Sequence, residues 1–191
     1  MKKSIVLLIF LCFGVALKAQ SKSEILPAVE KLISHSLEKD FEAILDCTYP
    51  KLFEHISADI MLEVLTASMD NEEFTIEIQP TDYDIEISNI KEIDGGKYAL
   101  VLYNVKMSLR FHYFIQSEID DFTEILNEFM PDAQVTFNRK DQSFEIFQRS
   151  GSIAISDDIT NRKWKFLNIS DQDKTLLKLL IDQKILNAFD L

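Results

Sequence analysis

The chain has 191 residues, of which 47% are hydrophobic, so it contains enough apolar material to bury a sizeable core. Its formal net charge of −12 at pH 7 opposes binding to phosphate backbones and anionic membranes, so nucleic acid is not an expected partner. Two cysteines and four glycines exclude a disulfide framework and a glycine-rich phosphate loop.

The N-terminal residues have the three parts of a secretory signal peptide. A pair of lysines precedes an apolar run at 5–17, and small residues follow it. This run is shorter than the roughly 20 apolar residues that a membrane-spanning helix needs. We therefore expect residues 1–19 to be removed by cleavage after Ala19, with Ala16 as the alternative position. The remaining chain, residues 20–191, would be a single exported domain in the periplasm or outside the cell.

Helical signals occupy the next part of the chain. Asp40 and Ser57 are suited to cap helices, and Pro50 stands just inside a short helix between them. The first helix is expected to start at Ser23, because the apolar residues that follow recur with the 3.6-residue period: Ile25, Leu26, Val29, Leu32, Ile33 and Leu37. The sequence therefore predicts four helices before the polar stretch DNEE at 70–73.

Alternating apolar and polar residues follow. FTIEI at 74–78 and DYDIEIS at 82–88 each place apolar side chains at every second position, and DGG at 94–96 predicts a hairpin turn. The next strand, from about Lys97 to Gln116, is longer than the roughly 3–10 residues of a typical strand, so we expect it to curl.

The C-terminal part adds two helices and three strands. EIDDFTEILNEFM at 118–130 has helical spacing, AQVTF at 133–137 and WKFLNIS at 164–170 read as strands, and Ser170 would cap a final helix. A long strand is expected at 143–156.

The apolar residues of this long strand change phase. Phe144 and Ile146 are at even positions, whereas Ile153 and Ile155 are at odd positions. One extra residue in a strand reconciles two such phases, so the sequence predicts a β-bulge near Gly151.

Helices followed by a run of antiparallel strands predict an α+β fold. The N-terminal helices would pack on one face of a curved antiparallel sheet, which would give a cone-shaped molecule with a cavity between helices and sheet. A helix between the strands and a C-terminal helix complete the expected architecture.

Three segments carry a resemblance to a known family. TYPKL at 48–52, the long strand beginning GKYALVLY at 96–103, and ISDD with the following WKFLNI resemble the nuclear transport factor 2-like superfamily of cone-shaped, cystatin-like α+β proteins. Within it, the chain is similar to a group of exported Bacteroidetes-type proteins of unknown function. The match spans most of the mature chain. It implies fold and export, and it carries no catalytic residues.

The chain departs from this group in two places. Residues 117–142 look like an insertion that contributes a helix and a hairpin. The loop DDITNRKW at 157–164 lacks the glycine that the group often has before its tryptophan.

The stretch YNVKMSLRFHYF at 103–114 has two unlike faces. Its even positions are polar and are expected on the convex side: Asn104, Lys106, Ser108, Arg110 and His112. Its odd positions are apolar, and with one tyrosine from the helical part they are the candidate lining of the cone for a small apolar ligand or protein partner: Tyr49, Tyr103, Met107, Phe111 and Tyr113. A shift of one residue in strand phase would exchange the two faces.

Metal and cofactor chemistry is not predicted. His35, His55 and His112 are far apart in sequence and have no ligand spacing, and His35 is expected to be exposed. The alternating acidic residues Asp82, Asp84 and Glu86 are interpreted as the solvated face of an edge strand, because calcium needs oxygens that converge from a loop.

Nucleophilic chemistry has one weak candidate, a thiolate–imidazole pair of Cys47 and His55 across the Tyr49–Pro50 kink. A buried, inert thiol is the favoured interpretation of Cys47.

Two functional hypotheses remain. The favoured one is a non-catalytic module that binds a ligand or another protein. The alternative is a small isomerase or lyase of the cone type, because enzymes of the superfamily use a tyrosine with an aspartate or histidine inside the cone; here these would be Tyr103 or Tyr49 with Asp84 or His112.

Some apolar side chains of the long strand are expected on its outer face, at Tyr98, Leu100, Leu102 and Phe114. They need cover from the final helix, the insertion or a second subunit. A homodimer through the sheet, which the resemblance implies, would supply the last of these.

Overall fold

The computed structural model describes residues 22–113, 116–169 and 174–191, and the predicted signal peptide lies outside them. The helices are an N-terminal helix at 22–38, α2 (Phe41–Cys47), α3 (Ala58–Met69), α4 (Ile119–Phe129), α5 (Lys174–Leu180) and α6 (Gln183–Ala188), with the 3-10 turns η1 (Pro50–Glu54) and η2 (Gln116–Glu118). The strands are β1 (Phe74–Gln79), β2 (Glu86–Ile87), β3 (Lys91–Ile93), β4 (Gly96–Phe111), β5 (Gln134–Asn138), β6 (Ser143–Ser156) and β7 (Lys165–Ile169).

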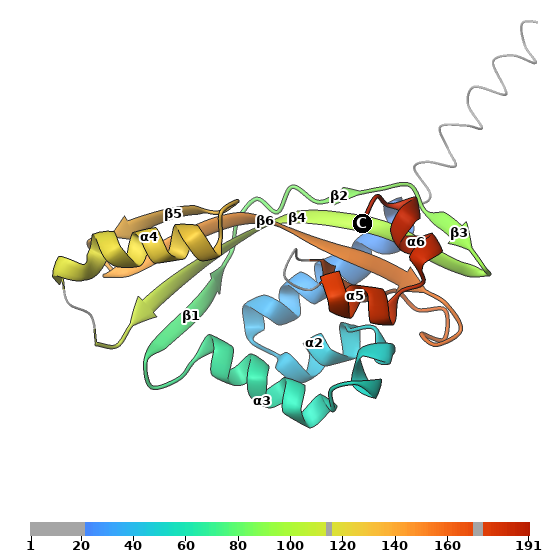
Figure 1. Ribbon diagram of the computed structural model, residues 1–191, viewed down its shortest axis with the longest axis horizontal. Helices are drawn as coiled ribbons and strands as arrows, with labels where there is room; N and C mark the ends of the chain where they lie inside the picture. The colour runs from blue at the N-terminus through green and yellow to red at the C-terminus, as the bar shows by residue number, and fades with distance from the viewer. Residues whose placement is uncertain (1–21, 114–115, 170–173) are drawn as a thin grey trace, which may run out of the picture.

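The two long strands β4 and β6 form the spine of the molecule (Figure 1). They are paired antiparallel from Lys97 opposite Ser156 to Leu109 opposite Phe144. β1 and β5 flank the spine at one end, and β2, β3 and β7 flank it at the other. The sheet is antiparallel throughout and not closed, and helices lie against it, so the predicted α+β fold is confirmed.

Two of the predicted helix caps, at Asp40 and Ser57, are confirmed, and the cap predicted at Ser170 lies outside the described residues. The Asp40 side chain accepts a hydrogen bond from the Ala43 amide at the start of α2, and the Ser57 hydroxyl accepts one from the Ile60 amide at the start of α3. Pro50 is the first residue of η1. The N-terminal helix already includes residue 22, so Ser23 lies inside it.

The hairpin between β3 and β4 turns at Asp94 and Gly95. Ile93 pairs with Gly96, and the two turn residues have φ of 48° and 82°. Positive φ at both central residues is what a two-residue type I′ turn requires. Gly96 is buried, and the Tyr98 side chain folds back over it: a Cβ at Gly96 would lie 2.8 Å from the Tyr98 Cζ atom.

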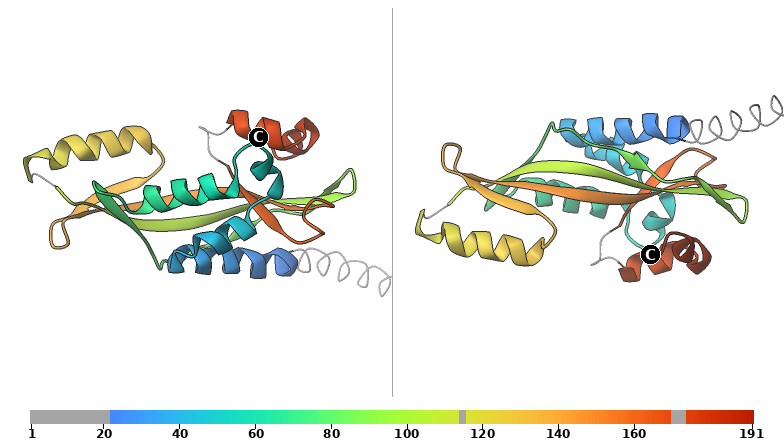
Figure 2. Two further views of the ribbon diagram at one scale, coloured as in Figure 1. Left: turned by 90° about the horizontal axis from the view of Figure 1, so that it is seen from below. Right: turned by 90° about the horizontal axis from the view of Figure 1, so that it is seen from above.

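Helices cover both faces of the sheet at the β3 end, and of the three covers considered for the outer face, the C-terminal helices supply it there. Figure 2 shows the N-terminal helix on one side of the spine and α5 and α6 on the other. On the first side, the N-terminal helix packs on β4, β6 and β7 through the buried residues Ile25, Val29, Ile33, Ala99, Val101, Ala154 and Phe166. On the other side, α5 and α6 pack through Leu177, Leu180, Ile185 and Leu186 on Tyr98, Ile153, Ile155 and Leu167.

This double cover corrects the prediction of a β-bulge near Gly151. The β4–β6 register is continuous through Gly151, which pairs with Leu102. No phase change is needed, because the even face of β6 is buried at both ends, at Ile146 and at Ala154. Ile153 and Ile155 are buried as well because α5 and α6 cover the odd face.

The predicted insertion forms a separate lobe at the other end of the spine. α4 packs on β1, β4, β5 and β6, and Phe144 lies at the centre of the contact with an exposure of 1%. The Phe144 ring has its centroid 5.0 Å from that of Phe137 and 6.1 Å from that of Phe111. We call this cluster and its elements the α4 lobe.

The acidic stretch before β2 is only partly a strand. Tyr83, Ile85 and Ile87 pack together against the cluster under the N-terminal helix, as their alternation predicted. Regular pairing is limited to Glu86 and Ile87, since Asp84 has a φ of 41° that a strand does not allow.

The cover expected for the outer face of β4 is supplied in part by the C-terminal helices. Tyr98 is buried beneath α5 and α6, whereas Leu100 and Leu102 stay partly exposed and Phe114 lies outside the described residues. In the described part of the chain, none of the helices has the length and apolar character needed to cross a bilayer.

Candidate ligand-binding site

A pocket of about 310 Å³ lies between the N-terminal helix, α2, α3 and the sheet. We call it the helix–sheet pocket. Its volume is at the lower end of the range of about 300–1,000 Å³ found for small-molecule sites. It is lined by Leu32, Ser36, Ile44, Leu45, Cys47, Thr48, Leu52, Met61, Leu65, Tyr103, Ser150, Ser152, Phe166, Leu167 and Asn168.

Helical spacing builds the walls of the pocket. Leu32 and Ser36 are four residues apart on the N-terminal helix, and Met61 and Leu65 are four residues apart on α3, so each pair projects from one helix face. The Ser36 hydroxyl donates to the Leu32 carbonyl at 2.9 Å and is therefore satisfied within its own helix. The helical walls are thus mainly apolar.

The sheet supplies a polar floor, which we define as Tyr103, Ser150, Ser152 and Asn168. Tyr103 pairs with Ser150 across β4 and β6, and Ser152 pairs with Asn168 across β6 and β7. Paired residues share a face of a sheet, and so do residues two apart in a strand. All four side chains therefore project from the same face of the sheet into one pocket.

The polar floor has hydrogen-bonding capacity that the protein does not use. Within the described residues, none of its four side chains makes a side-chain hydrogen bond, although Ser152 is only 3% exposed. The Ser152 hydroxyl oxygen is not among the fully enclosed atoms that lack a partner, and Asn168 is an exposed residue, so the floor is open to the space of the pocket. The floor is therefore suited to bind the polar group of a guest molecule.

The described lining of the pocket contains no acidic or basic side chain. Cys47 and Tyr103 are the ionisable groups among its described lining residues. Burial raises the pKa of the Cys47 thiol, and the nearby ammonium groups of Lys31 and Lys165 offset this only in part. The thiol is therefore protonated at neutral pH, which disfavours nucleophilic attack by Cys47. His55 is exposed and lies outside the pocket lining.

A smaller pocket of about 100 Å³ adjoins the helix–sheet pocket. Leu32, Ser36 and Tyr103 line both. Tyr103 thus borders both spaces, and the smaller one extends the site along the N-terminal helix toward Ile78 and Tyr83.

Two pockets of larger volume lie on the outer surface of the protein. They would surround a ligand less completely than the helix–sheet pocket does. One, of about 460 Å³, is lined only by α3 and the residue that follows it, so no second element closes it. The other, of about 600 Å³, lies beside the exposed Tyr113 and is lined by Asp70, Asn71, Glu72 and His112 as well. The helix–sheet pocket is the better candidate because several elements surround it.

The five residues predicted to line the cone lie in different parts of the protein and do not form one site. Tyr103 lines the helix–sheet pocket, whereas Met107 and Phe111 pack beneath α4. Tyr49 is buried with the C-terminal helices, and Tyr113 is 88% exposed. The odd-numbered side chains of β4 are apolar along most of the strand. The N-terminal helix covers those in its first half and α4 covers those in its second half, so they belong to two separate hydrophobic clusters.

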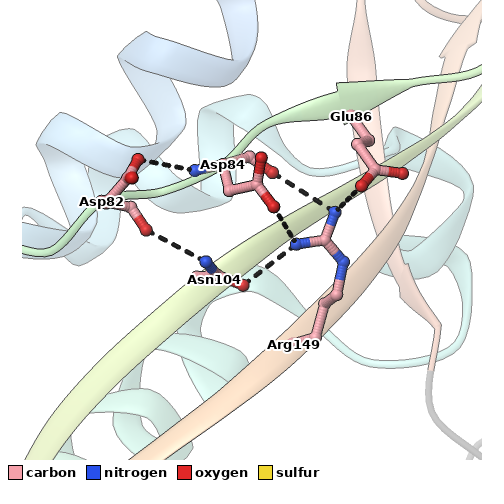
Figure 3. A network of polar contacts seen from close by, with 5 residues as sticks. All are labelled: Asp82, Asp84, Glu86, Asn104 and Arg149. Atoms are coloured by element: carbon pink, nitrogen blue, oxygen red, sulfur yellow. Dashed lines mark hydrogen bonds and ion pairs between the residues drawn. The ribbon is translucent and has the colours of Figure 1, made fainter.

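Asp84 belongs to a network on the opposite face from the pocket (Figure 3). Arg149 donates to the Asp84 carboxylate at 3.1 Å, to Glu86 at 2.7 Å and to the Asn104 side chain at 3.0 Å. Asn104 and Arg149 alternate with Tyr103 and Ser150, so their side chains leave the sheet on the other side. Two of the three acidic side chains of the row, Asp84 and Glu86, are thus paired with Arg149, and the Asp82 carboxylate accepts a hydrogen bond from the Asp84 amide; none of the three lines the helix–sheet pocket.

His112 lies at the far end of β4, away from the pocket lining. Its Nε2 is 2.9 Å from the Thr75 hydroxyl, and its Nδ1 is 3.2 Å from the Glu72 carbonyl oxygen. The structure therefore does not bring Asp84 or His112 together with Tyr103 or Tyr49.

His35 departs from its expected exposure. Both ring nitrogens are buried, and neither has a hydrogen-bond partner among the described residues. The closest acidic group is the Asp40 carboxylate, 3.8 Å from Nδ1. In the part of the chain that the structure describes, no cluster of histidine, cysteine or acidic side chains is arranged to hold a metal ion.

The polar floor was missed by the sequence interpretation, although it left a signal. RSGSIAIS at 149–156 places Ser150 and Ser152 at alternate positions of a strand that is otherwise buried, and WKFLNIS places Asn168 at the corresponding position of β7. Small polar residues on a buried face mark either a close approach or a polar site.

Tyr49 connects η1 to the loop between β6 and β7. Its hydroxyl donates to the Asp157 carboxylate at 2.8 Å. Burial, and next the hydrogen bond to Asp157, raise the pKa of Tyr49 above its ordinary value near 10. A raised pKa in the folded state means that the stabilisation is complete below about pH 10 and is lost as the pH rises beyond it.

We expect Tyr49→Phe to lower the free energy of unfolding by about 1–2 kcal/mol at pH 7, because it removes the donor to one carboxylate oxygen of Asp157 and leaves only the Thr160 amide on the other. We also expect the variant to lose less stability than the wild type between pH 10 and 11.5. Urea unfolding across this range measures both effects. Tyr113→Phe, at an exposed tyrosine, is the control and should follow the wild type. Parallel pH profiles for wild type and Tyr49→Phe would contradict this account.

Comparison with known proteins does not assign a function to the helix–sheet pocket. No protein-family model matches the chain, and no match is found among curated proteins.

Proposed function

We propose that the protein is an exported, non-catalytic module that binds a small molecule in the helix–sheet pocket. The observation that carries the proposal is the polar floor: a nearly fully buried Ser152 and three neighbouring polar side chains, without side-chain partners among the described residues, at the base of an apolar pocket. Apolar walls supply binding free energy, and a few placed polar groups fix the orientation of a ligand.

The chemistry of the lining supports binding over catalysis. A general acid or base must lie within hydrogen-bond reach of its substrate. The described lining residues include no carboxylate, imidazole or ammonium group, and the Cys47 thiol is held in its protonated form. Asp84 and His112 are engaged elsewhere.

The proposal includes export and the nuclear transport factor 2-like architecture. The signal-like first nineteen residues support export. An open antiparallel sheet with N-terminal helices packed on one of its faces is compatible with the cone-shaped superfamily.

A thermal-shift screen of small amphipathic molecules against the mature protein tests the proposal. A ligand present at a hundred times its Kd stabilises by about 2.7 kcal/mol, which for a domain of this size raises Tm by about 5–10 °C. Leu65→Trp places an indole in the pocket and should abolish the shift.

Ile60→Trp is the matched control, since Ile60 is on the same helix but 55% exposed and outside the pocket lining. It should respond to the ligand as the wild type does. If no small molecule raises Tm, or if Leu65→Trp keeps the full shift, the pocket is not the binding site and the proposal fails.

A further inference from the structure

We propose that the ligand is uncharged: an apolar body that carries one hydroxyl or primary amide group, which the polar floor recognises. This inference rests on the proposed function and specifies the chemical class of the ligand. It follows from the hydrogen-bonding groups of the floor, from the absence of a buried counter-charge in the described lining, and from the size of the pocket.

The floor presents both donors and acceptors. The hydroxyls of Ser150, Ser152 and Tyr103 can each donate one hydrogen bond and accept others, and the Asn168 side chain has a carbonyl oxygen and an amino group. A ligand group that both donates and accepts satisfies such a surface. Hydroxyl and primary amide groups have this property, whereas a carboxylate only accepts and an ammonium only donates.

The floor disfavours a charged group at its inner end. Ser152 is 3% exposed, whereas Asn168 at the other end of the floor is exposed, so a group bonded to Ser152 is the one most shielded from water. A charge in that position, without an opposite charge, costs far more free energy than a neutral polar group with hydrogen bonds. None of the described lining residues supplies that opposite charge.

Lys106 is part of the lining of the smaller adjoining pocket, but its ammonium group is 3.5 Å from the Glu145 carboxylate, and two further cationic side chains lie near Cys47. Lys31 and Lys165 both act on the Cys47 thiol, and the Lys165 ammonium donates to the Asp46 carbonyl oxygen. Neither lysine is part of the pocket lining. A ligand carboxylate would have to leave the floor to reach them, so binding by a carboxylate and binding at the floor are alternatives that can be told apart.

The apolar body is limited in size. The pocket holds about 310 Å³, and its apolar walls come from Leu32, Leu45, Leu65 and Phe166 among others. An eight-carbon chain is a suitable probe, because it offers enough apolar surface for measurable binding and varies easily at the head group.

The experiment uses four probes with the same octyl chain: octanol, octanamide, octanoate and octylamine. Binding to the mature protein is measured at pH 7 by calorimetry or by NMR titration, below the concentration at which each probe aggregates. We expect octanol and octanamide to bind at least tenfold more tightly than octanoate and octylamine.

Ser152→Ala tests the contact at the floor. It should weaken octanamide about tenfold, which is the upper end of the effect of a single neutral hydrogen bond. Ser108→Ala is the matched control: Ser108 is also a buried strand serine, with 5% exposure, but it lies outside the pocket lining and its replacement should leave the Kd unchanged.

The outcomes separate this inference from the proposed function. Tightest binding by octanoate or octylamine, with loss of binding in Leu65→Trp, overturns the uncharged ligand and keeps the pocket. Equal weakening by Ser152→Ala and Ser108→Ala overturns the role of the floor. If none of the four probes binds, the inference fails, and the thermal-shift screen decides separately whether the proposed function fails with it.

Discussion

Replacing Phe144 with alanine is expected to lower the free energy of unfolding by about 3–5 kcal/mol. Phe144 is 1% exposed and packs against the rings of Phe111, Phe122 and Phe137, with the closest ring centroids 5.0 Å apart. Alanine would leave a cavity that β6 cannot close, since β5 and β4 hold it on both sides. Urea unfolding monitored by circular dichroism measures the loss.

The same variant should change the pattern of local unfolding. The α4 lobe is a hydrophobic cluster separate from those at the other end of the spine. We therefore expect amide exchange to accelerate in β5 and α4 before it accelerates at Ala99 and Val101. Phe129→Ala, at a phenylalanine of α4 that is 67% exposed, is the control and should cost less than about 1 kcal/mol. A small effect of Phe144→Ala would show that the lobe is not closely packed.

Replacing Gly96 with alanine is expected to cost about 2–3 kcal/mol, although it adds a single methyl group. The new Cβ would lie 2.8 Å from the Tyr98 Cζ atom, and Tyr98 is 7% exposed beneath α5 and α6. Because the ring is packed in the cluster under the C-terminal helices, relief of the contact requires the ring or these helices to shift. Thermal and urea unfolding measure the cost.

Gly95 separates crowding from backbone strain in this test. It has a φ of 82°, and a Cβ added there would have no other atom within 4 Å, so only its backbone conformation is restrictive. Gly95→Asn should be nearly neutral, because asparagine tolerates the left-handed region. If Gly96→Ala is also nearly neutral, the packing of Tyr98 over Gly96 is looser than the structure indicates.

Short-range sequence signals correctly predicted several local features of the fold. The caps at Asp40 and Ser57 and the turn at Asp94 depend on residues within four positions, and all three are confirmed. The alternation of β4 also gave the correct division of its side chains, with Asn104 and Tyr103 on opposite faces.

The sequence pattern did not show which distant helix covers which face of the sheet. Periodicity shows which residues share a face, but it does not show which helix lies over that face. The alternation alone places Met107, Phe111 and Tyr103 on one face, although α4 covers the first two and the pocket adjoins the third. The bulge predicted near Gly151 was wrong for a related reason: the outer face of β4 was expected to need cover, but the pattern did not show that α5 and α6 lie over Ile153 and Ile155.

The β4–β6 ladder also sets an order in which the chain can close. Its innermost pair, Leu109 with Phe144, closes the shortest loop of the ladder, and its outermost pair, Lys97 with Ser156, closes the longest. Longer loops cost more chain entropy, so zippering from the α4 lobe outward is the least costly route. The helix–sheet pocket, which also needs the N-terminal helix, would then assemble late, and slower refolding of Phe144→Ala would report the early role of the lobe.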